Sequence, residues 1–331
     1  MAKKEIQFHD YNYMINKLRN KGMIIDDDKL AIELLQSVGY YGLVNKYKSE
    51  FYIQGKKEYQ ENVHLIDLYY YHTIEDELRN ILFQSIIHLE QRFKESMAYI
   101  IAKELGVKRT DYLIPNRYRR VNKAKKIITF LNETIEKCQD NPTKYYKNEY
   151  GDLPPWIMLS NLSFGQARML FSIFRFNWSK YVTIQLLNLN ERKQAFLHET
   201  IDTQEFVLIE FTRNIISIAY QFRNNLAHGN RLIHYHSKES LKINGLRLFA
   251  NVQVFSNEEY YSNNLCHNDL FALMVSLVIV LDKRDSVFFI NQLNLWQNSN
   301  FSNTKKDKQF NKFINSCELP VDFVKRLANL I

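Results

Sequence analysis

Apolar residues recur at intervals of three and four along most of this 331-residue chain, and little interrupts them. The sequence contains only nine glycines and five prolines, so long segments lack the residues that usually end helices. Side chains three and four positions apart share one face of an α-helix, and such an apolar face is buried by packing on other helices. The sequence therefore predicts a mainly α fold, a helical bundle of one or two domains.

The positions of glycine and of helix-capping residues predict where the helices lie. One helix covers 10–21 and ends at Gly22, a second begins near 26–28 and ends at Gly39, and a long segment over 63–105 is divided near 72–75. Further helices are expected near 119–138, 163–176, 178–188, 191–199, 204–228, 266–297 and 319–330. The alternating residues of "LRLFANVQVF" predict the one strand, half of a small β-hairpin.

Domain boundaries are predicted from composition. Three prolines and many polar residues in "QDNPTKYYKNEYGDLPPW" predict a linker near 139–156. We therefore expect an N-terminal helical region over 1–60, a helical core over 61–300 with a basic helix near 117–138, and a C-terminal helix over 301–331.

Three cysteines without CxxC spacing argue against a disulfide framework and a structural zinc site, and they fit a reducing cytoplasm. The first residues lack the apolar run of a signal peptide, and the longest apolar run, 270–281, is too short to span a bilayer. We therefore expect a cytoplasmic protein without a membrane segment.

The stretch "QFRNNLAHGNRL" ends the long helix predicted over 204–228. On a helical wheel one face of this helix is an apolar stripe made of Leu208, Phe211, Ile215, Ala219, Phe222 and Leu226. A second, polar line on the same wheel, predicted to face away from the core, consists of Glu210, Ser217, Gln221, Asn224 and His228. Asn224 and His228 are four apart, so the amide could hydrogen-bond the imidazole and fix its tautomer.

This helix end has two interpretations. As a C-cap, His228 and Arg223 would interact with the negative end of the helix dipole, and Gly229 would supply the left-handed residue. As a phosphodiester-cleaving site, the imidazole would act as acid or base and the guanidinium would stabilise charge on the phosphate, without a metal. One helix end has one histidine, so a two-fold dimer would be needed to supply two.

The residues "RNNLAH" resemble the motif of HEPN ribonucleases, in which an arginine and a polar residue precede a histidine by several positions. Together with "YNYMINKLRNKGMIIDDDKLAIELLQSVGYYGLVNKYKSEF" and "HTIEDELRNILFQSIIHLEQRFKESM", the chain resembles, over roughly 10–235, the Abi family of bacterial abortive-infection proteins (AbiD and AbiF type). The resemblance implies an HEPN-like bundle and a dimeric endoribonuclease toxin, with Arg223, Asn224 and His228 as catalytic residues. It also implies RNA as substrate and a small noncoding RNA as regulator.

Eight basic residues and one acidic residue lie between Lys108 and Lys126, in a chain whose net charge is +8. Such a concentration of charge, with Tyr112 and Tyr118 beside it, favours contacts to an RNA backbone. A solvated face of an ordinary amphipathic helix is the alternative. The residues expected to bind RNA are Arg117, Arg119, Arg120, Lys123, Lys126 and, after the helix end, Arg231.

Two other groups of polar residues in the sequence give weaker indications of function. A metal cluster could be drawn from His228, His234, His236, Cys266 and His267, but no CxxC or HExxH spacing accompanies it, so we expect neither metal nor cofactor. Glu90 and Arg92 are expected to be ion-pair partners on a helix surface or at an interface. The functional alternative to a ribonuclease is a non-catalytic RNA-binding protein whose Arg/His helix end is structural or anchors RNA.

Overall fold

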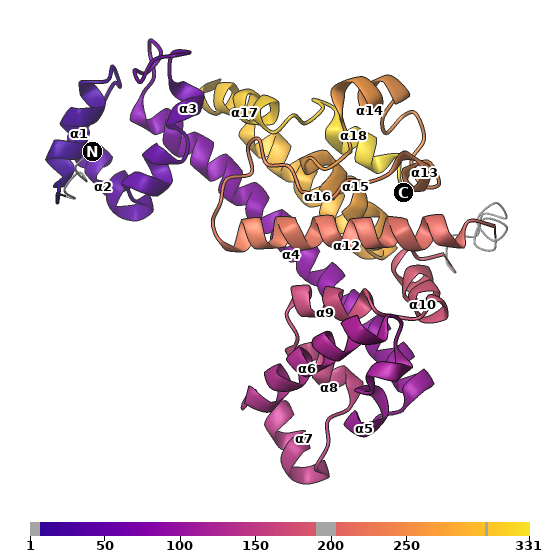
Figure 1. Cartoon of the computed structure of the whole chain (residues 1–331). Coiled ribbons are helices and arrows are strands. Elements are labelled where there is room, and N and C mark those ends of the chain that lie inside the picture. The colour runs from indigo at the N-terminus through magenta and orange to yellow at the C-terminus, as the bar shows by residue number, and fades with distance from the viewer. Residues whose placement is uncertain (1–6, 190–202, 302–303) are drawn as a thin grey trace. The chain divides into compact units, whose positions relative to one another are not determined.

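The computed structural model describes residues 7–189, 203–301 and 304–331, and helices cover most of them (Figure 1). The predicted mainly α fold is confirmed, while the helix expected near 191–199 lies outside the described residues. The described chain forms two compact units. One is drawn from residues 1–80, 231–234 and 294–317, and the other from 81–230, 235–293 and 318–331.

The first unit begins with two helices whose ends follow the capping residues. An Asp10 carboxylate oxygen accepts the Tyr13 N–H at 2.7 Å, and Asp27 caps the next helix. Gly39 ends that helix with a left-handed φ of 81°, as its position predicts. The unit contains α1 (Tyr11–Arg19), α2 (Asp28–Val38), the π-helical turn η1 (Tyr41–Asn45), α3 (Lys48–Phe51), α17 (Thr304–Ser316), the start of α4 (Leu65–Leu105) and the end of α16 (Lys283–Asn300).

Helix α4 passes through 72–75 without a break, so the division expected there is wrong. Glu75 is fully buried, and its carboxylate accepts hydrogen bonds from the Tyr47 hydroxyl and the Leu232 N–H. The Lys46 ammonium lies 2.7 Å from the same carboxylate. A buried carboxylate with these partners is stable in a helix interior, so the polar residue does not end the helix.

The second unit is built around α12 (Glu205–Ala227), the helix predicted over 204–228. Helix α12 packs against α9 (Phe164–Phe171), α10 (Phe176–Leu186), α13 (Ile243–Leu246) and α15 (Leu270–Val280). The other helices are α5 (Arg109–Tyr112), the 3-10 turn η2 (Pro115–Arg117), α6 (Val121–Lys137), α7 (Thr143–Tyr150), α8 (Pro155–Asn161), α14 (Asn257–Asn263), α18 (Phe323–Ala328) and most of α4 and α16.

The apolar stripe predicted for α12 is confirmed, because all six of its side chains are buried. Phe222, near the end of the helix, is fully buried and packs edge-on against Tyr235, with ring centroids 4.8 Å apart. On another side of α12, Gly165 of α9 lies so close that a Cβ there would be 2.9 Å from the Tyr220 ring. Tight packing on several sides fixes α12 within its unit.

Two local predictions are wrong. The segment 246–255 forms no strand: it ends α13 and continues as turns, and no sheet forms in the parts of the chain that the structure describes. Leu246, Ala250, Val254 and Phe255 of this segment are buried, while Val252 is exposed. The Arg247 guanidinium donates to the Phe255 carbonyl at 3.1 Å and lies 4.1 Å from the Phe255 ring. The segment 139–156, for which we expected a linker, contains the helix α7. This helix ends at Gly151, which has a left-handed φ of 64°.

Candidate functional site

Helix α12 ends at the Arg223–His228 motif in the geometry of a C-cap. The His228 N–H donates to the Asn224 carbonyl at 3.1 Å, and Gly229 follows with a left-handed φ of 66°. The backbone is therefore satisfied without the imidazole. The His228 side chain is exposed, so this ring is accessible to a ligand from solvent.

The Arg223 guanidinium is placed by a carboxylate on α4. Its Nε lies 4.0 Å from Glu90 Oε2, while the Lys94 ammonium lies 2.6 Å from the other Glu90 oxygen. Glu90 is only 8% exposed, and both Arg223 Nε and Glu90 Oε2 are buried without a hydrogen-bond partner in the described chain. The charge of Glu90 therefore favours a guanidinium at this position, next to the helix end.

Glu90 and Arg92 do not pair with each other as the sequence led us to expect. Arg92 instead donates hydrogen bonds to the Gln185 carbonyl and to the Asn188 side chain. The role of Glu90 at the motif was missed, because 133 positions separate it from Arg223 and no local pattern links them. Its position four residues before Lys94 predicts only a helical ion pair.

Asn224 contacts the arginine of the motif. Its side-chain oxygen accepts from Arg223 Nη1 at 3.5 Å. Between the described side chains of Asn224 and His228 there is no hydrogen bond, unlike the expectation from their i, i+4 spacing. Arg223 and Asn224 thus form one group, and among the described residues the His228 ring makes no hydrogen bond or ion pair with either of them.

The polar line of α12, predicted to face away from the core, is covered by the same chain in its middle, at Ser217, Gln221 and Asn224, while Glu210 and His228 at its two ends are exposed. Ser217 is 8% exposed and its hydroxyl accepts from Arg168 Nη1 at 3.3 Å. The Gln221 side-chain oxygen accepts from the Lys238 N–H at 2.7 Å. Since Asn224 is half-buried and His228 is exposed, one accessible end of this line coincides with the motif.

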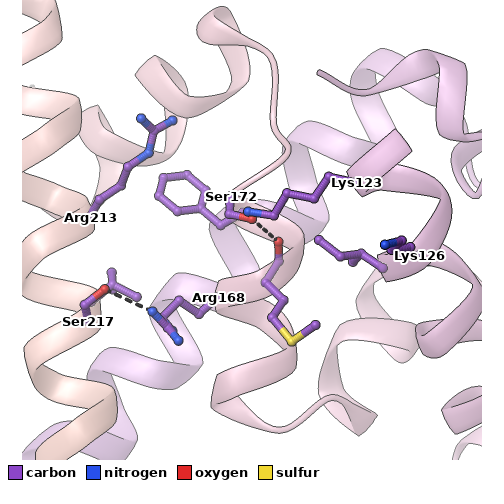
Figure 2. A pocket seen from close by; sticks show the side chains of 10 residues that line it. Lys123, Lys126, Arg168, Ser172, Arg213 and Ser217 are labelled. Atoms are coloured by element: carbon purple, nitrogen blue, oxygen red, sulfur yellow. Dashed lines mark hydrogen bonds between the residues drawn. The ribbon is translucent and has the colours of Figure 1, made fainter. Parts of the chain in front are cut away.

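Most of the basic stretch is exposed, and its residues line two different cavities. Lys123 and Lys126 of α6 line a cavity together with Arg168 and Arg213 (Figure 2). Arg117 lines a different cavity, with Arg175 and Glu104. The remaining predicted RNA-binding residues, Arg119, Arg120 and, in the 231–234 segment, Arg231, are all exposed.

Sequence reasoning missed Arg168 and Arg213, and it misjudged two tyrosines. Neither arginine belongs to a basic run, so only the packing of α9 and α12 beside α6 reveals them. Tyr112 and Tyr118 are buried, and their hydroxyls donate to the carbonyls of Leu153 and Tyr112. They hold the loop before α6 in place and present no ring to a nucleic acid base.

The histidines and the cysteine considered as metal ligands do not come together in one site. His236 lies 3.5 Å from Glu318, the His267 ring lies against the Tyr260 ring at a tilt of 35° with centroids 3.8 Å apart, and Cys266 is fully buried. Within residues 7–189, 203–301 and 304–331, no group of three or more histidine, cysteine or acidic side chains is arranged to hold a metal ion.

In the same described ranges, no helix is both long enough and apolar enough to cross a membrane. Comparison with curated proteins and with solved structures found no match. Residues 33–234 match the family of Abi-like proteins. The match covers more than half of the chain, including Glu90, the basic stretch and the end of α12, and the chain therefore belongs to the Abi-like protein family.

Proposed function

We propose that this protein is a metal-independent endoribonuclease toxin of an abortive-infection or RNA toxin–antitoxin system. Membership in the Abi-like family suggests a role in abortive infection. The finer proposal, cleavage of RNA in the cytoplasm under the control of a small noncoding RNA, rests on the resemblance of the α12 end to HEPN ribonucleases.

One observation carries the proposal: α12 ends in an exposed histidine, five residues after an arginine that forms an ion pair with a buried carboxylate. Glu90 sets the position of Arg223 from the side of α4, and the C-cap satisfies the backbone at His228. The imidazole is therefore free for proton transfer, and the guanidinium is positioned before a substrate arrives.

The chemistry follows from the two side chains. The 2′-oxygen of a ribose attacks the adjacent phosphorus, and the bond to the 5′-oxygen of the next nucleotide breaks. An imidazole removes the 2′-hydroxyl proton or protonates the leaving 5′-oxygen, while Arg223 binds the phosphate oxygens as their charge increases. The products are a 2′,3′-cyclic phosphate and a 5′-hydroxyl. The nucleophile belongs to the RNA, so the reaction needs no metal-activated water.

Acid and base are both required, and each chain brings one motif histidine. We place the second histidine in a symmetric dimer, in which two α12 ends face a shared groove. Asn224 then keeps Arg223 oriented through the hydrogen bond between their side chains, and His228 of each protomer acts at the same phosphodiester.

The experiment compares His228→Ala with His236→Ala, a second exposed histidine of the same unit. Loss of acid–base catalysis should lower the cleavage rate of single-stranded RNA by about 10² to 10⁴-fold in the first variant only. Both variants should fold, because neither side chain is buried. Equal rates in parent and His228→Ala would contradict the proposal.

The C-cap geometry favours one alternative, a non-catalytic RNA-binding protein in which this helix end is structural or anchors RNA. The His228 N–H and Gly229 already complete the cap. In that case the parent protein would bind RNA without cleaving it. The RNA would stay intact with the parent and with His228→Ala alike, and the melting temperature of the variant protein would be close to that of the parent.

A further inference from the structure

A cavity of about 400 Å³ lies between three helices of the second unit. On α12 its lining residues are Arg213, Ile216 and Ser217, which precede the His228 motif. Figure 2 shows labelled side chains that enter it from α6, α9 and α12. Four are cationic: Lys123, Lys126, Arg168 and Arg213. Among the residues that the structure describes, no acidic side chain lines the cavity.

The two arginines are held by neutral groups. Arg168 Nη1 donates to the Ser217 hydroxyl at 3.3 Å, and its guanidinium lies 4.7 Å from the centre of the Tyr220 ring. Arg213 donates to the Ser179 hydroxyl at 3.3 Å. The Nε atoms of both arginines are buried without a hydrogen-bond acceptor in the described chain. These contacts fix the guanidinium groups but do not neutralise their charge.

The positive charge around the cavity is not paired directly, although the Glu210 carboxylate acts on Arg213 without forming an ion pair and partly opposes the lowering of its pKa. Among the described residues, none of the four cations forms an ion pair with a carboxylate. Partial burial, followed by the charges of Arg120 and Arg119, lowers the pKa of Lys123. Burial and the same two arginines lower the pKa of Arg213. Like charges brought this close repel one another, and a bound anion would relieve that repulsion.

The apolar part of the cavity lining indicates which chemical group a bound anion would carry. Its remaining side chains include the apolar Ile127, Met169, Phe171 and Ile216. A cavity of this size accommodates a ligand of about nucleotide size, since small-molecule sites span roughly 300 to 1,000 Å³. A ligand with a phosphate and a flat apolar ring would use both parts of the wall, and the planar guanidinium fork suits phosphate oxygens.

We propose that the cavity between α6, α9 and α12 binds a phosphate-bearing nucleotide, with the phosphate on Lys123, Arg168 and Arg213 and the base against Ile127 and Met169. The nucleotide is either one residue of an RNA chain or a free nucleotide. This inference adds a binding site to the proposed function and does not depend on it, because it concerns binding and not cleavage at His228.

The position of the cavity on α12 links it to the motif. Ser217 and His228 are eleven residues apart, which places them on nearly the same face of the helix and about 16 Å apart along its axis. Between these two positions Gln221 and Asn224 are half-buried, so the cavity and the exposed end of α12 are two separate positions on one helix.

The test measures binding by the full chain with two probes. Each of the four nucleoside 5′-monophosphates is titrated by calorimetry, with the matching nucleoside and inorganic phosphate as references, and a single-stranded RNA is titrated by fluorescence anisotropy. The variants are Arg213→Gln and Lys123→Gln. The second replaces an exposed side chain, so it reports on the site even if the first fails to fold. The control is Lys125→Gln, which removes an exposed lysine of α6 outside the cavity lining.

Loss of a charged contact to phosphate should weaken binding by about tenfold or more in both variants and not in Lys125→Gln. If RNA is the source, RNA affinity falls and the monophosphates bind no more tightly than inorganic phosphate. If the source is a free nucleotide, a monophosphate binds the parent more tightly than its nucleoside does. The two cavity variants then lose affinity for the monophosphate and keep their affinity for RNA. The proposal is overturned if the parent binds neither probe, or if Lys123→Gln and Lys125→Gln bind both probes equally well.

Discussion

Glu90 and Arg223 show what sequence can and cannot reveal about single residues. Arg223 and His228 stand out because a polar motif ends an otherwise apolar helix, and the structure leaves the His228 ring exposed at that end. Glu90 does not stand out, since a glutamate four residues before a lysine occurs on many helix surfaces. Only the fold shows that its buried carboxylate lies 4.0 Å from the Arg223 guanidinium.

The substitution Glu90→Gln should destabilise the protein. The change leaves the Lys94 ammonium and the Arg223 guanidinium without their anionic partner, and breaking a buried ion pair costs about 3 kcal/mol or more. The free energy of unfolding, measured by denaturant titration, should fall by that amount. Glu95→Gln, at an exposed position of the same helix, is the control, and equal stability of the two variants would refute a structural charge at Glu90.

At the scale of elements, the ends of helices were predicted better than their interiors. Asp10, Asp27 and Gly39 lie at the ends of α1 and α2 because capping depends on neighbouring residues alone. The continuity of α4 through Glu75 depends on Tyr47 and Leu232, which are distant in sequence. The strand predicted over 246–255 is wrong for a similar reason: residues that alternate in polarity also occur in turns, and here the Arg247 guanidinium bonds the Phe255 carbonyl within the segment instead of a neighbouring strand.

Packing of α12 through its apolar stripe gives a prediction with a control on the same helix. Phe222 is fully buried, so Phe222→Ala should lower the free energy of unfolding by about 3 to 5 kcal/mol. Phe206 is 77% exposed, and Phe206→Ala should change the same quantity by less than about 0.5 kcal/mol. Denaturant titration measures both, and similar losses for the two variants would mean that the stripe does not anchor α12.

At the scale of the whole molecule, composition predicted a polyanionic partner but not the arrangement of the charge. The excess over Lys108–Lys126 is visible in the sequence. Its separation into a cavity containing Lys123 and another containing Arg117 depends on which helices pack beside α6, and so does the participation of Arg168 and Arg213. Long-range packing of this kind leaves no local pattern in the sequence.

Reversing three charges tests whether the basic stretch binds RNA. Changing Arg119, Lys123 and Lys126 to Glu should weaken RNA binding and flatten its dependence on salt, because each lost phosphate contact lowers the slope of log affinity against log salt by about 0.7 for a single strand. The control reverses three exposed lysines elsewhere, Lys29, Lys56 and Lys57, which changes the net charge equally. If both triple variants lose affinity to the same extent, binding depends on net charge and not on this surface.

Mixing two inactive variants tests the paired site. If the active groove takes groups from two chains, Arg223→Ala and His228→Ala should each be inactive, and their exchanged mixture should regain part of the parent rate, because some grooves then hold one intact arginine and one intact histidine. The opposite result has two parts: the parent cleaves RNA at its full rate as a monomer, and the exchanged mixture of variants stays inactive. It would show that one chain contains the complete site.

The chemical ends of the RNA products test the central claim most directly. A defined single-stranded RNA is incubated with purified protein in excess EDTA, and the fragments are analysed by mass spectrometry beside those from His228→Ala and from an RNA with a 2′-deoxyribose at the mapped cleavage site. Attack by the 2′-hydroxyl predicts fragments with 2′,3′-cyclic phosphate and 5′-hydroxyl ends from the parent alone, and none at the deoxy position. Fragments with 5′-phosphate ends, cleavage at the deoxy position, or equal cleavage by His228→Ala would contradict an RNA-cleaving site at the end of α12.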